Sequence, residues 1–311
     1  MSRMNRREAF RGVYSLLLTP FRDSGAIDWN AYERYVEWQC ASSPQGLFAV
    51  CGSSEMKWLT LEERLALARS AVTLAGPLPV VATANAGPDS DRHEEELLRI
   101  VDTGVAAVVL VPPDGLGREP NRLKDYFLRL ADASPVPVIL YEWPQVHPYE
   151  IAPALYRELA ATGRVVGIKD TTCTPEGISA KIEAAPDTIV YQANTPFLFD
   201  AIRAGAQGIM ATISTAASRT VVGFWEAIVN GETRAEEEHR KLVFLDAALR
   251  FGYPATAKYL VQLQGIPFPT HCRAGQGMSV EAKKAVDVWM RAYAGSVLQG
   301  EPHDRMTGGI L

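Results

Sequence analysis

The chain has 311 residues, a formal net charge of −5 and a sequence pI near 5.7. This acidic balance, without a run of lysines and arginines interleaved with aromatic residues, argues against nucleic-acid binding. No stretch approaches the roughly 20 apolar residues that a membrane span needs, and the apolar run after the basic N-terminus is too short for a secretory signal. We therefore expect a cytoplasmic protein that binds neither nucleic acid nor membrane.

The cysteines and histidines give no sign of a bound metal or of a disulfide framework. The 4 cysteines lie far apart without a Cys-x-x-Cys pair, and the 5 histidines lack the spacing of metal ligands. We expect neither a metal nor a separate cofactor.

Eight short apolar runs alternate with longer amphipathic stretches along most of the chain. The runs are predicted strands at residues 13–18, 46–50, 79–82, 106–111, 136–140, 165–168, 188–191 and 208–211. The stretches are predicted helices at residues 29–40, 61–74, 92–101, 122–131, 152–161, 175–184, 196–204 and 216–229. This alternation fits an open doubly wound sheet as well as a closed barrel. Eight repeats favour an α/β fold of the (β/α)8 TIM-barrel type, whose active sites lie at the carboxyl ends of the strands.

Several predicted helices carry start signals. Thr60 with Glu63 forms a capping box, and Thr174 and Thr195 each precede a proline at the first helical position. These signals support the helix boundaries.

The pattern changes after residue 230, where no further strands are predicted. Residues 232–250, 255–264 and 280–294 have helical patterns. We predict a barrel at residues 1–230, an appended C-terminal helical region at 231–298 and a disordered polar tail at 299–311.

Lys169 ends the sixth predicted strand, within Gly167-Ile168-Lys169-Asp170. A lysine at the end of a buried strand loses solvation, which disfavours its ammonium form and frees the amine to attack a carbonyl carbon. A lysine here can also be an ordinary ion-pair partner of Asp170. The position alone leaves both readings open.

Tyr141 ends the fifth predicted strand. Neighbouring strands lie about 4.8 Å apart, so a phenol and an amine at their ends can share one substrate. A tyrosine at such a position is also common as a core residue whose hydroxyl has a protein partner.

Four motifs together resemble the dihydrodipicolinate synthase and N-acetylneuraminate lyase family of pyruvate-dependent class I aldolases. They are Leu18-Thr19-Pro20-Phe21, Tyr141-x-x-Pro144, Gly167-Ile168-Lys169-Asp170 and Gly205-x-x-Gly208. The resemblance implies that Lys169 forms a covalent imine with a 2-oxo acid and that Tyr141 relays protons. It also implies a homo-oligomer, a dimer or a tetramer.

The resemblance further implies that the loop after the second strand binds the substrate carboxylate. The loop here is Cys51-Gly52-Ser53-Ser54-Glu55. An ungapped match uses Gly52 and Ser53, whereas a shift of one residue uses Ser53 and Ser54. Hydroxyl and backbone N–H groups are available in either register.

Further substrate-binding candidates follow the sixth to eighth strands. They are Thr171, Asn194 and Met210, with Gln192, Thr212 and Ser214 near them. Their polarity suits the recognition of hydroxyl groups, and no glycine-rich phosphate loop lies among them.

Two positions depart from the family pattern. Residues 111–115, Val-Pro-Pro-Asp-Gly, lack the tyrosine that the family extends across a subunit interface. Tyr141 would then act with a loop serine, with water, with a carboxylate or hydroxyl of the substrate, or with Asp114 as a substitute acid–base group. Residues 145–148, Gln-Val-His-Pro, lack the arginine with which dihydrodipicolinate synthases bind the carboxylate of their aldehyde. The second departure argues against authentic dihydrodipicolinate synthase activity.

The leading hypothesis is a Schiff-base lyase that joins or separates pyruvate and an aldehyde, acting on a 3-deoxy sugar acid or a 4-hydroxy-2-oxo acid. Alternatives with the same imine are a 2-keto-3-deoxy sugar acid dehydratase and an aromatic hydratase-aldolase. The altered loop after the fourth strand, with Trp143 near the site, leaves room for an aromatic substrate. An alternative of another class is a regulatory homologue that binds its ligand with little turnover.

Overall fold

The computed structural model describes residues 8–275 and 277–298. Eight parallel strands form a closed barrel in which each strand pairs with the next along the chain and β8 pairs with β1. The strands are β1 (Gly12–Leu16), β2 (Gly46–Phe48), β3 (Val80–Thr83), β4 (Ala107–Leu110), β5 (Val138–Tyr141), β6 (Val165–Asp170), β7 (Ile189–Gln192) and β8 (Gly208–Ile209). The predicted TIM barrel is confirmed.

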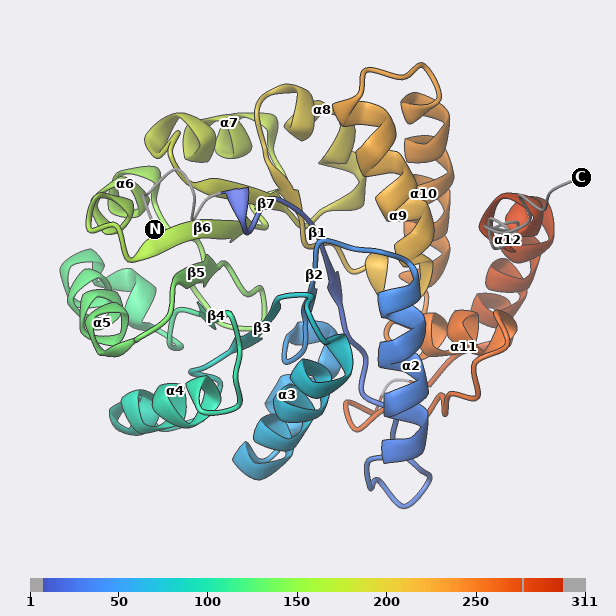
Figure 1. The fold of residues 1–311 in the computed structure, drawn as a ribbon, viewed down its shortest axis with the longest axis horizontal. Helices are drawn as coiled ribbons and strands as arrows, with labels where there is room; N and C mark the ends of the chain where they lie inside the picture. The colour runs from blue at the N-terminus through green and yellow to red at the C-terminus, as the bar shows by residue number, and fades with distance from the viewer. Residues whose placement is uncertain (1–7, 276, 299–311) are drawn as a thin grey trace, which may run out of the picture.

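Helices surround the barrel on its outside (Figure 1). They are α2 (Trp29–Ala41), α3 (Leu61–Ala75), α4 (His93–Val101), α5 (Pro120–Ala133), α6 (Pro153–Ala161), α7 (Pro175–Ala184), α8 (Leu198–Arg203) and α9 (Ser214–Val229). Each overlaps a helix that the apolar spacing predicts. The stretch predicted at 196–204 is divided, because a 3-10 turn at Thr195–Phe197 precedes α8.

Two of the three expected helix caps are present. The Thr60 hydroxyl accepts a hydrogen bond from Glu63 N at 3.2 Å, while the Glu63 carboxylate accepts one from Thr60 N at 2.9 Å. The Thr174 hydroxyl accepts from Gly177 N at 3.1 Å. The expectation for Thr195 was wrong, because its hydroxyl donates to Asp246 at 3.0 Å.

Aromatic side chains fill the barrel near the amino ends of the strands. The rings of Tyr14 and Tyr191 are fully buried and meet edge to face, with centroids 5.7 Å apart. A Cβ atom at Gly46 would lie 2.3 Å from the Tyr14 ring, and one at Gly208 would lie 2.3 Å from the Tyr191 ring. These glycines therefore make room for the two rings that close this end.

The C-terminal region contains α10 (Ala235–Leu249), α11 (Ala255–Leu263) and α12 (Val280–Leu298), which overlap the three predicted helices. Helix α10 packs beside α9, and α11 and α12 continue on that side of the barrel (Figure 1). The tail predicted to be disordered, 299–311, lies outside the described residues. No helix in the described part of the chain is long and apolar enough to cross a membrane.

Candidate active site

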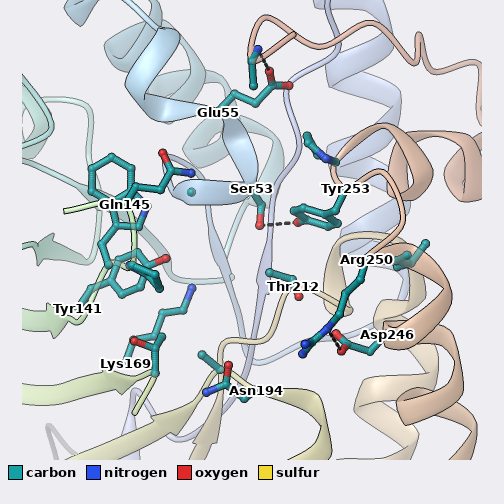
Figure 2. A pocket seen from close by; sticks show the side chains of 18 of the residues that line it. Ser53, Glu55, Tyr141, Gln145, Lys169, Asn194, Thr212, Asp246, Arg250 and Tyr253 are labelled. Atoms are coloured by element: carbon teal, nitrogen blue, oxygen red, sulfur yellow. Dashed lines mark hydrogen bonds and ion pairs between the residues drawn. The ribbon is translucent and has the colours of Figure 1, made fainter. Parts of the chain in front are cut away.

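A cavity of about 460 Å³ lies at the carboxyl ends of the strands (Figure 2). Its walls come from the loop after β2, from the ends of β5, β6 and β7, and from the segment between α10 and α11. Parts of the chain that are far apart in sequence therefore meet around one pocket.

Lys169 extends from β6 into this pocket and is only 2% exposed. Its Nζ lies 4.1 Å from the centroid of the Tyr141 ring and 5.5 Å from that of Phe48. Burial lowers the pKa of Lys169 to about 8. At pH 7 about a tenth of such an amine is neutral, which is roughly 300 times the fraction expected for an ordinary lysine.

Lys169 does not form the alternative ion pair with Asp170. The Asp170 carboxylate instead accepts hydrogen bonds from Thr172 and Gln192 and lies 3.6 Å from the amine of Lys181. Because no carboxylate near Lys169 favours its ammonium form, desolvation determines the direction of the pKa shift.

Tyr141 is the direct neighbour of Lys169 across the β5–β6 pair. Its side chain lines the pocket and is 5% exposed, and burial raises its pKa well above the ordinary value. The phenol therefore stays protonated in the free protein. No described residue forms a hydrogen bond with this hydroxyl, so it is available to a substrate.

The residues of the loop after β2 differ in whether they face the pocket. Gly52 and Ser53 line the pocket, whereas Ser54 does not. The Ser54 hydroxyl points away, accepting from Cys51 N at 3.1 Å and sharing its one proton between Leu17 O and Ala49 O, at 2.7 and 2.8 Å. The Ser54 hydroxyl is used to hold the backbone of the loop, which favours the register with Gly52 and Ser53.

The conformation of this loop is held from two sides. The Thr19 hydroxyl donates to Ser54 O at 2.8 Å, which gives the Leu18-Thr19-Pro20-Phe21 motif a structural role. Glu55 has a left-handed backbone with φ of 58° and accepts from the buried amine of Lys258 at 2.7 Å and from Ala274 N at 2.9 Å. Non-glycine residues adopt this conformation only when their surroundings hold them there.

The other predicted substrate-binding residues are divided between the pocket wall and the core. Asn194 and Thr212 line the pocket, and the side-chain nitrogen of Asn194 is buried without a hydrogen-bond partner among the described residues. Thr171 also lines it, although its hydroxyl donates to Glu142 O. Met210 is fully buried and does not line the pocket. It follows β8 and packs in the core.

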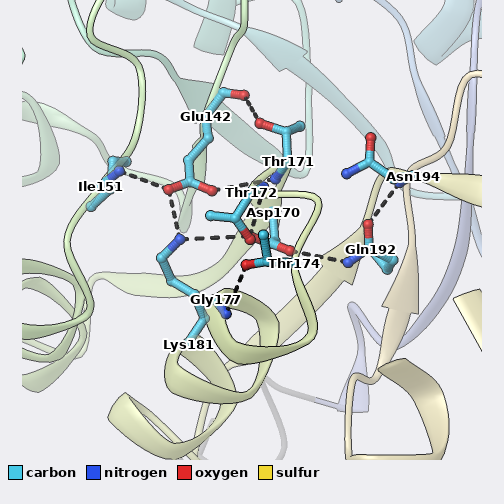
Figure 3. Close-up of polar contacts among 10 residues, drawn as sticks. All are labelled: Glu142, Ile151, Asp170, Thr171, Thr172, Thr174, Gly177, Lys181, Gln192 and Asn194. Carbon is cyan, nitrogen blue, oxygen red and sulfur yellow. Dashed lines mark hydrogen bonds and ion pairs between the residues drawn. The ribbon is translucent and has the colours of Figure 1, made fainter. Parts of the chain in front are cut away.

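A buried charge cluster supports the ends of β5 and β6 (Figure 3). The amine of Lys181, on α7, lies 2.6 Å from the Glu142 carboxylate and 3.6 Å from that of Asp170. Glu142 also accepts from Ile151 N at 2.7 Å and from Thr171 N at 3.3 Å. Burial outweighs the attraction of Lys181 and raises the pKa of Glu142 to about 7. The sequence motifs did not predict this cluster.

Neither departure from the family pattern brings Asp114 or His147 to the pocket wall. Asp114 and His147 do not line the pocket, and Asp114 instead accepts from His147 N at 3.0 Å. Gln145 lines the pocket with no arginine beside it in the 145–148 segment. Neither Asp114 nor His147 is placed to act on a substrate there.

Sequence reasoning missed the part of the wall that comes from the C-terminal region. Asp246, Arg250 and Tyr253 line the pocket together with Trp58 from the β2 loop. The available signal was the break between two predicted helices at Phe251-Gly252-Tyr253-Pro254, where glycine and proline mark a corner.

Comparison with known proteins identifies the family. A sequence model of the dihydrodipicolinate synthetase family matches residues 9–290. The chain belongs to this family. It is a pyruvate-dependent lyase, because members of the family are class I aldolases, which are carbon–carbon lyases.

Relatives of known name include both synthases and an aldolase. A 4-hydroxy-tetrahydrodipicolinate synthase of Chelativorans sp. (strain BNC1) is 30% identical, over 82% of this chain and 89% of the relative. The probable 2-dehydro-3-deoxy-D-pentonate aldolase YjhH of Escherichia coli (strain K12) is 26% identical, over 91% of this chain and 97% of the relative. Family members thus differ in the reactions for which they are named.

Solved structures share the fold. YagE of E. coli K12, in complex with pyruvate, superposes with a TM-score of 0.86 at 23% identity, over 92% of this chain and 99% of YagE. CdNal of Clostridium difficile, in complex with mannosamine, gives a TM-score of 0.84 at 18% identity, over 91% and 99% of the two chains.

The family chemistry uses an imine between a lysine and pyruvate and needs no metal. Within residues 8–275 and 277–298, no group of three or more His, Cys, Asp or Glu side chains is arranged to hold a metal ion.

Proposed function

We propose that the chain is an aldolase that cleaves a 2-oxo-3-deoxy sugar acid into pyruvate and an aldehyde, with Lys169 as the nucleophile and Tyr141 as the proton relay. The observation that carries the proposal is the buried amine of Lys169, which lies 4.1 Å from the centre of the Tyr141 ring in a shared pocket. Imine chemistry requires a neutral amine beside an acid–base group.

In the first step the neutral amine of Lys169 adds to the C2 carbonyl of the substrate, and water is lost as the imine forms. The pKa of about 8 keeps part of the amine neutral near physiological pH. Proton transfers in this step require a donor within hydrogen-bond reach, and the Tyr141 hydroxyl is available because no described residue uses it.

In the second step the C3–C4 bond breaks, and its electrons move into the protonated imine to give an enamine. The C4 hydroxyl loses its proton as the aldehyde forms, and Tyr141 relays that proton. Protonation of the enamine at C3 and hydrolysis then release pyruvate and restore the amine. The imine stabilises the charge that develops at C3.

The polar wall of the pocket supports a hydroxylated substrate. Asn194 offers a side-chain nitrogen that has no partner, and Thr212, Gln145 and Arg250 lie around the same space. Polar groups that converge on a pocket determine which oxygens of a ligand are recognised. The relative named for 2-dehydro-3-deoxy-D-pentonate supports the same substrate class.

Aromatic side chains favour a second candidate, a hydratase-aldolase acting on an aromatic 2-oxo acid. Trp58 and Trp143 both line the pocket and could stack on a ring of the substrate. Conversely, the lack of an arginine at 145–148 supports the view that the chain is not an authentic dihydrodipicolinate synthase.

The proposal is tested by trapping the imine. The protein is incubated with pyruvate and borohydride and analysed by peptide mass spectrometry. We expect one reduced adduct on the peptide that contains Lys169, its loss in Lys169→Ala, and its retention in Lys124→Ala, which removes a lysine that is 39% exposed at the side chain on α5. Absence of an adduct in the wild-type protein would overturn the proposal.

A substrate panel then separates the alternatives. Release of pyruvate from 2-oxo-3-deoxy sugar acids supports the aldolase, whereas loss of water without pyruvate release indicates a dehydratase. Turnover confined to aromatic 2-oxo acids indicates the second candidate. An adduct without turnover on any member of the panel indicates a regulatory homologue.

A further inference from the structure

We infer that Tyr253, in the C-terminal region, positions the Ser53 hydroxyl to donate a hydrogen bond to the carboxylate of the bound 2-oxo acid. The inference rests on the proposed function, since it concerns how the same pocket holds its substrate. It would make the C-terminal region of this chain a working part of its own active site.

The first observation is a direct contact between two lining residues. The Tyr253 hydroxyl donates to Ser53 Oγ at 2.6 Å, and both side chains line the cavity that contains Lys169. Figure 2 shows this pair across the pocket from Tyr141. The contact joins segments 200 positions apart in the sequence.

The direction of this hydrogen bond determines what Ser53 can do. The Tyr253 phenol is the donor, and burial raises its pKa well above the ordinary value, so it keeps the proton that it donates. A serine hydroxyl has one proton and two acceptor positions. Because Ser53 Oγ accepts from Tyr253 and has no other hydrogen-bond partner among the described residues, its own proton is free to point into the pocket. Donating hydrogen bonds in series also strengthens each member.

The neighbouring loop position explains why this donor matters. Gly52 has no side chain, and a Cβ atom there would lie 3.3 Å from the Tyr141 hydroxyl and 3.2 Å from Trp143 Nε1. Ser54 points away from the pocket. Ser53 is therefore the hydroxyl of residues 52–54 that faces the substrate.

Hydrogen bonds also hold the chain corner that carries Tyr253. The corner between α10 and α11 is closed by Thr256, whose hydroxyl donates to Leu249 O at 2.6 Å and whose N–H donates to Gly252 O at 3.1 Å. The β2 loop has a separate anchor in the buried Glu55–Lys258 ion pair. Removing the Tyr253 hydroxyl should therefore change the orientation of the Ser53 hydroxyl without releasing the loop.

The experiment compares two ketones in the Tyr253→Phe variant. Pyruvate carries the carboxylate that Ser53 would bind, whereas acetone has a methyl group in its place. Adduct formation on Lys169 is measured with cyanoborohydride over a range of ketone concentrations. We expect the half-saturating concentration of pyruvate to rise about tenfold, which is typical for a weakened hydrogen bond to a charged group, and that of acetone to stay unchanged.

Three comparisons complete the test. Ser53→Ala should weaken pyruvate at least as much, and the double variant should be no worse than Ser53→Ala, because Tyr253 acts through Ser53. Tyr259→Phe is the matched control, since it removes a 2.7 Å hydrogen bond to Asp287 in the same region but away from the pocket, and it should alter neither ketone.

An equal effect of Tyr253→Phe on pyruvate and acetone, or no effect on either, would overturn the inference while leaving the imine chemistry intact. Absence of a pyruvate adduct in the wild-type protein would instead refute the proposed function and this inference with it.

Discussion

Replacing Lys181 with methionine tests the charge cluster beneath the site. Lys181 is 1% exposed, and its amine lies 2.6 Å from Glu142 and 3.6 Å from Asp170. Methionine fills most of the same space but leaves two buried carboxylates without their cation. Removal of one partner from a buried ion pair lowers the free energy of unfolding by about 3 to 5 kcal/mol. We expect a loss of that size at pH 8.

The loss should depend on pH through Glu142. The pKa of this carboxyl is raised to about 7 in the folded protein, from an ordinary value of 4.5, and removal of Lys181 raises it further. A raised pKa in the folded state gives stability that is complete below the unfolded pKa and is lost as the pH rises through the folded pKa. The Lys181→Met variant can keep Glu142 protonated at pH 6. Its loss in the free energy of unfolding, relative to the wild type, should therefore be smaller at pH 6 than at pH 8.

Urea unfolding at pH 6 and pH 8 measures both effects. Lys124→Met is the matched control, because Lys124 forms a 2.7 Å ion pair with Glu158 in which the two side chains are 39% and 55% exposed. Such a pair contributes at most about 1 kcal/mol. Adding Glu142→Gln to Lys181→Met should restore part of the lost stability. Equal losses for the two lysine variants, or a deficit that shrinks as the pH rises, would refute the reasoning.

Three further predictions concern the pocket. The initial rate of pyruvate trapping on Lys169 should be half-maximal near pH 8, since burial lowers the pKa of the amine to about 8, and a midpoint near 10 would contradict this. Tyr141→Phe should lower turnover by about 10² to 10⁴ and also slow the formation of the pyruvate adduct, which mass spectrometry can follow, because Tyr141 relays protons in both steps; unchanged turnover would mean that Tyr141 is not the proton relay. Gly52→Ala should lower kcat/KM about tenfold with an unchanged melting temperature, because its Cβ would lie 3.3 Å from the Tyr141 hydroxyl and displace it. Unchanged kinetics would show that the hydroxyl tolerates the displacement.

The barrel could be predicted because buried parallel strands are continuous apolar runs and the helices between them are amphipathic. The ends of the strands were less predictable. The eighth run was expected to extend to residue 211, but β8 ends at Ile209 although Met210 and Ala211 remain fully buried. Buried positions are usually apolar whether or not they pair in the sheet, so an apolar run can extend beyond the end of the strand.

The pairing of Lys169 with Tyr141 could be anticipated because both lie at the carboxyl ends of neighbouring strands, Tyr141 as the last residue of β5 and Lys169 as the last but one of β6, and strand ends are local features of the sequence. The direction of a side chain within a loop is not local in this sense. Ser53 and Ser54 are identical neighbours, and only the turn of the 3-10 segment at Gly52–Ser54 decides which one faces the pocket. Tyr253 depended on a contact across 200 positions, which no periodic pattern encodes.

Strand alternation has a consequence for the electrostatics of the site. Tyr141 and Lys169 contribute to the pocket, while Glu142 and Asp170, each one residue further on, join Lys181 outside the barrel. The sheet thus separates two charge environments, one on its pocket side and one on its outer side. On the pocket side, the amine of Lys169 has no carboxylate as a partner among the described residues. On the outer side, the carboxylates of Glu142 and Asp170 lie one residue further along the chain. A chain slip of one residue in β6 would exchange these environments and place an aspartate where the amine now lies.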